Sequence, residues 1–166
     1  MNHILTAEGE ARAWFEQSFH PTAKQWQQLE RFAELLRSEN DKQNLIAAST
    51  VENLWVRHLA DSAQLLTLIP AKDGPWIDLG SGPGLPGLVL AILSDAPITL
   101  VESRKLRCNF LRDVAAELLL SNVTVAEARL ELVESFPATY ISARAFAPLE
   151  KLLKLANRFA AQDCTW

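Results

Sequence analysis

Glycine is concentrated in one short stretch of this chain. The 166 residues include six glycines, and four of them lie between Gly80 and Gly87, in the stretch WIDLGSGPGLPGLVL (76–90). A β-prone apolar segment precedes this cluster and a helix-prone apolar segment follows it. Because glycine has no Cβ atom, such a turn lets a ligand touch the backbone. One or two glycines would be enough to tighten an ordinary strand–helix turn, so the cluster predicts a binding surface.

The rest of residues 71–166 shows strands and helices in alternation. Strand-like segments fall at 76–80, 98–103, 122–128, 139–146 and 162–166, and helix-like segments at 86–94, 103–120 and 147–160. This order predicts right-handed crossovers and an α/β fold with a parallel, doubly wound sheet. Ligands of such sheets bind at the carboxyl ends of the strands. We therefore expect the glycine cluster to lie at the binding edge.

Residues 1–70 are expected to form a separate helical segment that packs on the sheet domain. Apolar residues recur at helical spacing in 21–40 and again in 49–70. Ser49 or Thr50 is a plausible cap for the second helix, and Pro70 is expected to end it. The stretch AKDGP (71–75) is rich in turn-forming residues and predicts the joint between the two parts.

Composition limits the choice of partners and compartment. The 16 basic and 20 acidic residues give a net charge of −4, which argues against a surface that coats nucleic acid throughout. A local basic group, Arg104, Lys105, Arg107 and Arg112, could be a solvated helix face or a phosphate contact. No stretch is apolar enough to predict a membrane span or a signal peptide. Two cysteines without metal-site or disulfide spacing favour a reduced, cytoplasmic compartment.

The turn favours S-adenosylmethionine over a dinucleotide. The dinucleotide fingerprint is G-x-G-x-x-G, and its third glycine is replaced here by Leu85. Pro83 and Pro86 have no N–H group to offer a phosphate. Asp78, two residues before Gly80, would repel a pyrophosphate and attract the cationic sulfonium of S-adenosylmethionine. Glu102 follows Gly80 by 22 residues, close to where an acid holds ribose hydroxyls in these folds.

These motifs, taken together, resemble those of a known family. The chain is similar to RsmG (glucose-inhibited division protein B), a bacterial rRNA guanine-N7 methyltransferase family. The similar stretches span most of residues 40–160 in order: NL at 44–45, VRHLADS at 56–62, WIDLGSGPGLPG at 76–87, ITLVES at 98–103, FLRDVAAEL at 110–118 and ISARAFAPL at 141–149. The resemblance implies a Rossmann-like S-adenosylmethionine-binding domain behind N-terminal helices. It also implies about three more strands after residue 160, including an antiparallel one, so we expect this chain to be a C-terminally truncated form that ends as the fifth strand begins.

The resemblance also implies a set of cofactor contacts. It carries over to Gly80, Leu85, Leu130, Glu131 and Arg144, and the argument from the turn adds Asp78, Gly82, Gly84 and Glu102. Each has a simpler interpretation. Leu130 could be a core residue, Glu131 a solvated acid, and Arg144 the partner of a structural carboxylate.

The resemblance implies methylation of N7 of guanine 527 in the 16S rRNA of the small ribosomal subunit. Candidate substrate contacts are Asn44, Arg57, His58, Arg104 and Lys105. Arg57 and Asp61 could instead pair along a helix and dock the N-terminal segment, with a hydrogen-bonded His58. We expect no metal and no acid–base catalytic residue, because guanine N7 carries no proton.

Three alternatives remain at this point. The chain could be a fragment that at most binds S-adenosylmethionine without turnover. It could be an NAD-dependent oxidoreductase, which Leu85 and the turn prolines oppose. It could also methylate another RNA or a small molecule, because the turn does not identify the substrate.

Overall fold

The core of the computed structural model is one parallel sheet with helices on both faces. The structure describes residues 8–69, 74–144 and 146–166. The strands are β1 (Trp76–Leu79), β2 (Ile98–Glu102), β3 (Val123–Glu127), β4 (Ala138–Ala143) and β5 (Ala160–Thr165), in the spatial order β3-β2-β1-β4-β5. All four neighbouring pairs are parallel. The predicted α/β class and doubly wound sheet are confirmed, although β5 begins two residues before the segment 162–166 assigned from the sequence.

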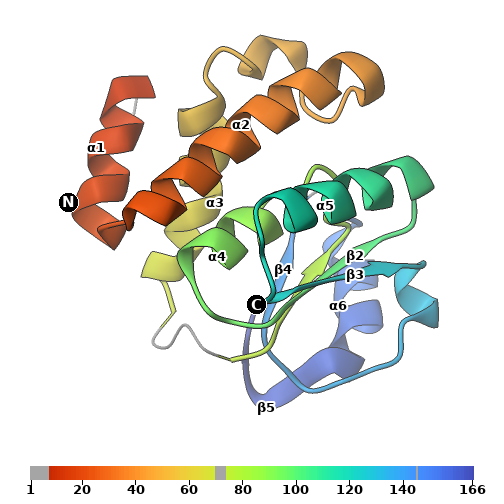
Figure 1. The fold of residues 1–166 in the computed structure, drawn as a ribbon. Coiled ribbons are helices and arrows are strands. Elements are labelled where there is room, and N and C mark those ends of the chain that lie inside the picture. Colours follow the sequence, from red (N-terminus) through yellow and green to blue (C-terminus); the bar gives the residue numbers. More distant parts are fainter. Residues whose placement is uncertain (1–7, 70–73, 145) are drawn as a thin grey trace.

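The helices divide between the two faces of the sheet. The helices α4 (Gly87–Leu93) and α5 (Lys105–Glu117) lie on one face, and α6 (Leu149–Ala156) lies on the other (Figure 1). A short 3₁₀ turn, η4 (Leu130–Leu132), follows β3, and η5 (Asn157–Phe159) follows α6. The chain therefore changes face after β3, so the order of the strands reverses beside β1. That point is the place where ligands bind in sheets of this kind.

Successive side chains of the strands pack into two hydrophobic cores, one on each face of the sheet. Ile98 and Leu100 of β2 pack with α4, α5 and the N-terminal helices, whereas Val101 packs with Phe159 on the face of α6. A parallel strand covered on both faces is expected to be apolar throughout, because successive side chains point to opposite faces. The sequences WIDL and ITLVE show this pattern, apart from one buried acidic residue in each, Asp78 and Glu102.

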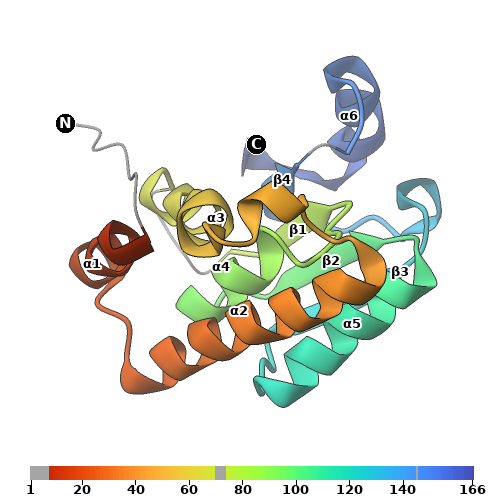
Figure 2. The same ribbon diagram turned by 90° about the horizontal axis from the view of Figure 1, so that it is seen from above.

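Two long helices form the start of the N-terminal segment. They are α1 (Glu8–Phe19) and α2 (Ala23–Gln43). Thr22 and Gln25 form a capping box at the start of α2, which satisfies two N–H groups of its first turn. Figure 2 shows α2 running across α4 and α5, and buried residues of α2 such as Leu29 and Phe32 belong to the same core as the sheet.

The segment after α2 differs from the single helix expected over 49–70. It consists of a 3₁₀ turn η1 (Ala48–Thr50), a wide π-helical stretch η2 (Trp55–Ala60), one turn α3 (Asp61–Ala63) and a 3₁₀ turn η3 (Gln64–Thr67). The predicted cap at Ser49 or Thr50 is wrong: the Thr50 hydroxyl donates to the Ala47 carbonyl, and Glu8 of α1 accepts the N–H groups of Trp55 and Val56. The expected stop at Pro70 and most of the joint 71–75 lie outside the described residues.

A buried hydrogen bond joins the N-terminal segment to the sheet domain. The side-chain amide of Gln28, which is buried in α2, donates to the carbonyl of Leu118 at the end of α5, with an N···O distance of 2.6 Å. A carbonyl that is buried without a partner costs about 1–3 kcal/mol. This contact therefore contributes to the docking of α2.

We predict that Gln28→Ala lowers the free energy of unfolding by about 1–3 kcal/mol, because the Leu118 carbonyl loses its partner. The matched control is Gln27→Ala, which removes the same side chain from an exposed neighbouring position. Urea denaturation followed by circular dichroism measures both. Equal stability of the two variants would contradict a docking role for Gln28.

Candidate functional site: a cleft at the carboxyl ends of the strands

The glycine turn after β1 adopts a left-handed backbone at three positions. The φ angles are +68° at Gly80, +53° at Gly82 and +87° at Gly84, a region that residues with a Cβ atom rarely adopt. The N–H groups of Gly80 and Ser81 both donate to the carbonyl of Val101, at 2.8 and 3.0 Å, which holds the turn against β2. The turn conformation thus explains why glycine is needed.

Only part of this turn faces a cavity. A Cβ atom on Gly84 would lie 2.3 Å from Leu88 Cδ1, and one on Gly87 would lie 2.2 Å from Leu100 Cδ2. These two glycines therefore let α4 pack closely on the turn and the sheet. Gly82 is buried as well, with its N–H bonded to Glu102. Of these four glycines, Gly80 lines the cavity at the carboxyl edge of the sheet. Gly84 packs against α4, Gly82 bonds to Glu102, and neither is among the residues that line this cavity.

The cavity beside Gly80 is a cleft of about 390 Å³ at the carboxyl edge of the sheet. The residues that follow four neighbouring strands line it, together with α5 and α6: Gly80 after β1, Val101–Ser103 and Arg107 at β2, Ala128–Glu131 after β3, and Phe146, Ala147, Lys151 and Leu155 after β4. A cleft at the point where the strand order reverses is the expected ligand site of an open α/β sheet. We call it the glycine-turn cleft.

Glu102 is a prominent acid of this cleft. The residue is 6% exposed, and its carboxylate accepts the N–H groups of Gly82, Ser103 and Arg104 at 2.7–3.1 Å. Arg107 approaches the same carboxylate at 3.7 Å. A carboxylate has about four lone-pair sites, and three are used here. Glu102 is thus fixed in place with one site left to accept a hydroxyl from a ligand.

The loop after β3 supplies the cleft residues that the resemblance implied. Leu130 is 2% exposed and Glu131 is exposed, and both line the cleft. Leu130 also belongs to the core on the face of α6, so its core interpretation holds as well. Arg129, Phe146 and Lys151 line the cleft too and were not predicted. Phe146 could have been predicted from the sequence, because it lies between a strand and a helix in residues 143–149. Residues that follow a parallel strand lie at the binding edge of the sheet.

Two expected cofactor contacts lie inside the protein. Leu85 is a core residue, 2% exposed, and it does not line the cleft. Asp78 is 1% exposed; its Oδ1 accepts the hydroxyl of Ser142 at 2.7 Å, which in turn accepts the indole N–H of Trp76 at 2.9 Å. Within the described residues Oδ2 makes no hydrogen bond. Burial raises the pKa of Asp78. Its carboxyl contacts Ser142 inside the protein and does not line the cleft.

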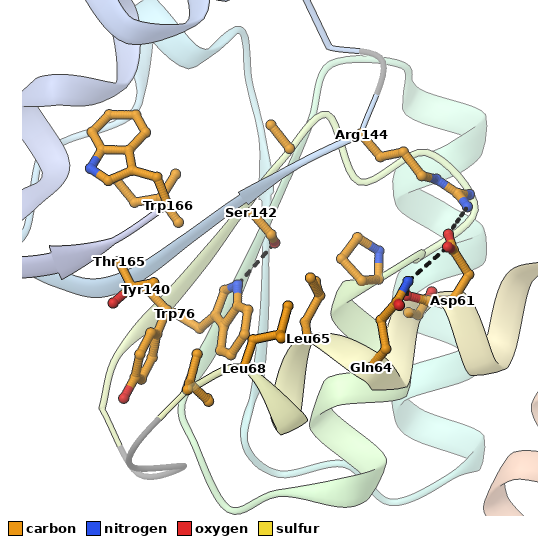
Figure 3. A pocket seen from close by; sticks show the side chains of 15 residues that line it. Asp61, Gln64, Leu65, Leu68, Trp76, Tyr140, Ser142, Arg144, Thr165 and Trp166 are labelled. Atoms are coloured by element: carbon orange, nitrogen blue, oxygen red, sulfur yellow. Dashed lines mark hydrogen bonds and ion pairs between the residues drawn. The ribbon is translucent and has the colours of Figure 1, made fainter. Parts of the chain in front are cut away.

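Arg144 also points away from the glycine-turn cleft. Its guanidinium lies 3.8 Å from a carboxylate oxygen of Asp61 and 3.5 Å from Nδ1 of His58, at the rim of a second cavity of about 350 Å³ (Figure 3). Trp76, Tyr140 and the exposed Leu68 also line that cavity. The structure therefore shows Arg144 as the partner of a carboxylate that docks the N-terminal segment.

His58 completes this docking cluster. Its Nε2 lies 2.7 Å from the Thr50 hydroxyl, and the residue is 9% exposed. Burial lowers the pKa of His58, and the positive charge of Arg144 lowers it further. The contacts fit a neutral ring that donates from Nε2 and accepts from Arg144 at Nδ1.

The other candidate substrate residues are on the surface. Asn44 ends α2 in a left-handed conformation with φ of +51°, which gives it a structural role as the helix cap. Arg57, Arg104 and Lys105 are exposed. Arg104 and Lys105 stand at the start of α5, two and three residues after Glu102. Among the described residues there is no group of three possible metal ligands, and no described helix is long and apolar enough to span a membrane.

Comparison with known proteins now identifies the family. The family model described as rRNA small subunit methyltransferase G matches residues 25–166. The chain belongs to this family. Ribosomal RNA small subunit methyltransferase G of Sphingopyxis alaskensis is 58% identical over 98% of the chain and 70% of its own length, and that of Novosphingobium aromaticivorans is 47% identical over 98% and 72%. This chain thus spans about 70% of the length of such members of the methyltransferase G family.

Solved structures confirm the fold class. The chain is similar to an MtNAS variant solved in complex with S-adenosylmethionine, with a TM-score of 0.60, 18% identity and coverage of 82% of this chain and 52% of that one. A protein of Methanococcus maripaludis described as an S-adenosyl-L-methionine-dependent methyltransferase has a TM-score of 0.56 at 18% identity, with 77% and 57% covered. The methyltransferase G chain therefore has the Rossmann-like fold of S-adenosylmethionine-dependent methyltransferases, and it spans about half of these solved chains.

We predict that Arg144→Gln raises the pKa of His58, because it removes a positive charge that opposes protonation of the ring.

In the wild-type protein the lowered pKa of His58 means that the folded state binds fewer protons than the unfolded state. The contribution of His58 to stability is therefore present above about pH 6.5 and decreases as the pH falls below it.

NMR titration of the His58 ring measures this pKa. Arg112→Gln is the control, because it removes the same charge from a residue that pairs with Glu127. A His58 pKa that is equal in wild type and Arg144→Gln would contradict the contact.

Proposed function

We propose that this chain binds S-adenosylmethionine in the glycine-turn cleft and transfers its methyl group to N7 of a guanine in small-subunit rRNA. The observation that carries the proposal is the cleft itself, with a glycine whose backbone faces it and a fixed carboxylate on the next strand, in a member of the methyltransferase G family. The names of the relatives support rRNA of the small subunit as the substrate. The choice of atom N7 and of guanine 527 rests on the resemblance of the sequence to the RsmG family. A cytoplasmic location and the small subunit as partner follow from the same proposal.

The residues of the cleft fit this cofactor. Gly80 lines the cleft at the end of β1, and Glu102 keeps one lone-pair site for a ribose hydroxyl. Leu130 lines the cleft next to the end of β3, and we place the adenine beside it. Gly87, at the start of α4, packs on Leu100 and is buried. A pyrophosphate would therefore not find the exposed helix N-terminus that holds phosphates in dinucleotide-binding folds.

In this reaction the protein contributes mainly by orienting the two reactants and not by transferring a proton. When bound, S-adenosylmethionine supplies a methyl group that is activated by its positively charged sulfur. Guanine N7 carries a lone pair and no proton, so the protein need not provide a general base. Holding two reacting groups in line can lower a barrier by about 7–11 kcal/mol. Glu102 and the glycine turn would hold one reactant, and the surface beside the cleft would hold the other.

Exposed cations beside the cleft would orient the RNA. Arg104 and Lys105 are exposed at the start of α5, two and three residues after Glu102. Arg57 is exposed on η2, next to His58, and is not among the residues that line the cleft. Phosphate contacts by such residues fix the register of a nucleic acid without reading its sequence. With a net charge of −4 for the whole chain, binding would depend on this local group of cations.

The proposal predicts that the protein transfers tritiated methyl groups from S-adenosylmethionine to small ribosomal subunits that lack the modification. Digestion to nucleosides should place the label in 7-methylguanosine. Label in another nucleoside would contradict N7 as the acceptor. Cofactor binding without any label would mean that the chain holds S-adenosylmethionine but lacks the geometry for transfer.

Glu102 is expected to contribute strongly to cofactor binding. Glu102→Gln should raise the Kd for S-adenosylmethionine about 10-fold or more, because a hydrogen bond to a charged group contributes about 1.5–3 kcal/mol. The matched control is Glu127→Gln, which changes the same residue type at the end of β3, where it pairs with Arg112. Isothermal titration calorimetry measures both. Equal Kd values for the two variants would place the cofactor elsewhere.

A further inference from the structure

Phe146 lies directly against the glycine that faces the cleft. A Cβ atom built on Gly80 would be 2.6 Å from Cδ2 of Phe146, so the edge of the ring occupies the space that a side chain at position 80 would fill. The ring is half-buried against the core on the face of α6, and it lines the glycine-turn cleft. The ring is therefore packed against the core, and part of it borders the cleft.

The strand order indicates which part of the cofactor this ring would meet. Along the cleft the lining residues follow β3, β2, β1 and β4 in turn, and neighbouring strands are about 4.8 Å apart. If the ribose is held by Glu102 after β2, the group attached to its 5′ carbon extends toward Gly80 after β1 and Phe146 after β4. In S-adenosylmethionine that group is the sulfonium.

A sulfonium is difficult for a protein to recognise. It carries a positive charge but no N–H or O–H group, so it cannot donate an ordinary hydrogen bond. The face of an aromatic ring attracts a cation within about 6 Å of its centroid. Phe146 is the aromatic residue among those that line the cleft. The cationic side chains there, Arg107, Arg129 and Lys151, would repel a sulfonium. The two acids of the lining, Glu102 and Glu131, follow β2 and β3, on the side of the cleft away from β4.

We infer that Phe146 is the residue by which this site recognises the positive charge on the cofactor sulfur. This inference rests on the proposed function and adds a specificity determinant to it. S-adenosylhomocysteine, the product, has the same adenosine and amino acid groups but a neutral sulfur. A cation–π contact therefore favours S-adenosylmethionine over S-adenosylhomocysteine, which helps the product to leave.

The test compares the Kd of each ligand for the wild-type protein and for Phe146→Leu by isothermal titration calorimetry. The ratio of the two Kd values, product over cofactor, should fall about 3- to 30-fold in Phe146→Leu, the factor that a cation–π contact contributes. Phe146→Tyr, which keeps the ring, should preserve the ratio. Sinefungin, which carries an ammonium group at the position of the sulfonium, should also bind Phe146→Leu less tightly.

Phe136→Leu is the matched control. Phe136 packs on Phe159 in the same core, with ring centroids 5.7 Å apart, and it does not line the cleft. It should lower stability without changing the ratio.

Two results would overturn the inference while leaving the proposed function intact. One is an equal loss of affinity for both ligands in Phe146→Leu, which would mean that the ring only packs. The other is tighter binding of S-adenosylmethionine by this variant, which would mean that the ring obstructs the cleft. A wild-type protein that binds neither ligand would instead overturn the proposed function, and the inference with it.

Discussion

The hydrogen bonds from the turn after β1 to the carbonyl of Val101 are the interaction on which the site depends. They bring the left-handed backbone of Gly80 to the end of β2, next to Glu102, which in turn accepts the N–H of Gly82. Turn and carboxylate thus hold each other in place before any ligand arrives. Because their geometry is fixed by backbone groups, the cleft is preorganised, and binding need not be offset by the cost of ordering a loop.

The N-terminal helices share one hydrophobic core with α4, α5 and the face of the sheet that these two helices cover. Helix α2 lies across α4 and α5, and buried side chains of both parts pack together. Asp61 and His58 then meet Arg144 where β4 ends, close to the edge that carries the cleft. The position of the N-terminal segment is therefore coupled to the loop after β4, which also carries Phe146. We infer that this segment helps to shape the side of the site where an acceptor would approach.

The sequence predicted the sheet well because strand-like and helix-like segments alternate along it, and β1, β2 and β4 are short, mostly apolar stretches, each followed by a turn and a helix. It predicted the segment 49–70 less well, because its caps come from residues distant in sequence, such as Glu8. Gly80 and Glu102, which line the cleft, were expected there from their place at the end of a strand, whereas Leu130 and Glu131 were expected only from the family resemblance. Asp78 and Leu85 have the same spacing signal but turn inward, and Arg144 turns toward Asp61. The direction in which a side chain points depends on the residues packed around it. The sequence alone does not show which residues those are.

The central claim is that the glycine-turn cleft, and not the cavity lined by Trp76 and Arg144, receives S-adenosylmethionine. NMR titration of the labelled protein with this ligand tests it most directly, since backbone amide signals report which cavity is occupied. We expect the signals of Gly80, Gly82 and Ser103 to shift until the site is saturated, while those of Leu68 and Thr165, at the other cavity, stay unchanged. Shifts confined to Leu68 and Thr165 would contradict it.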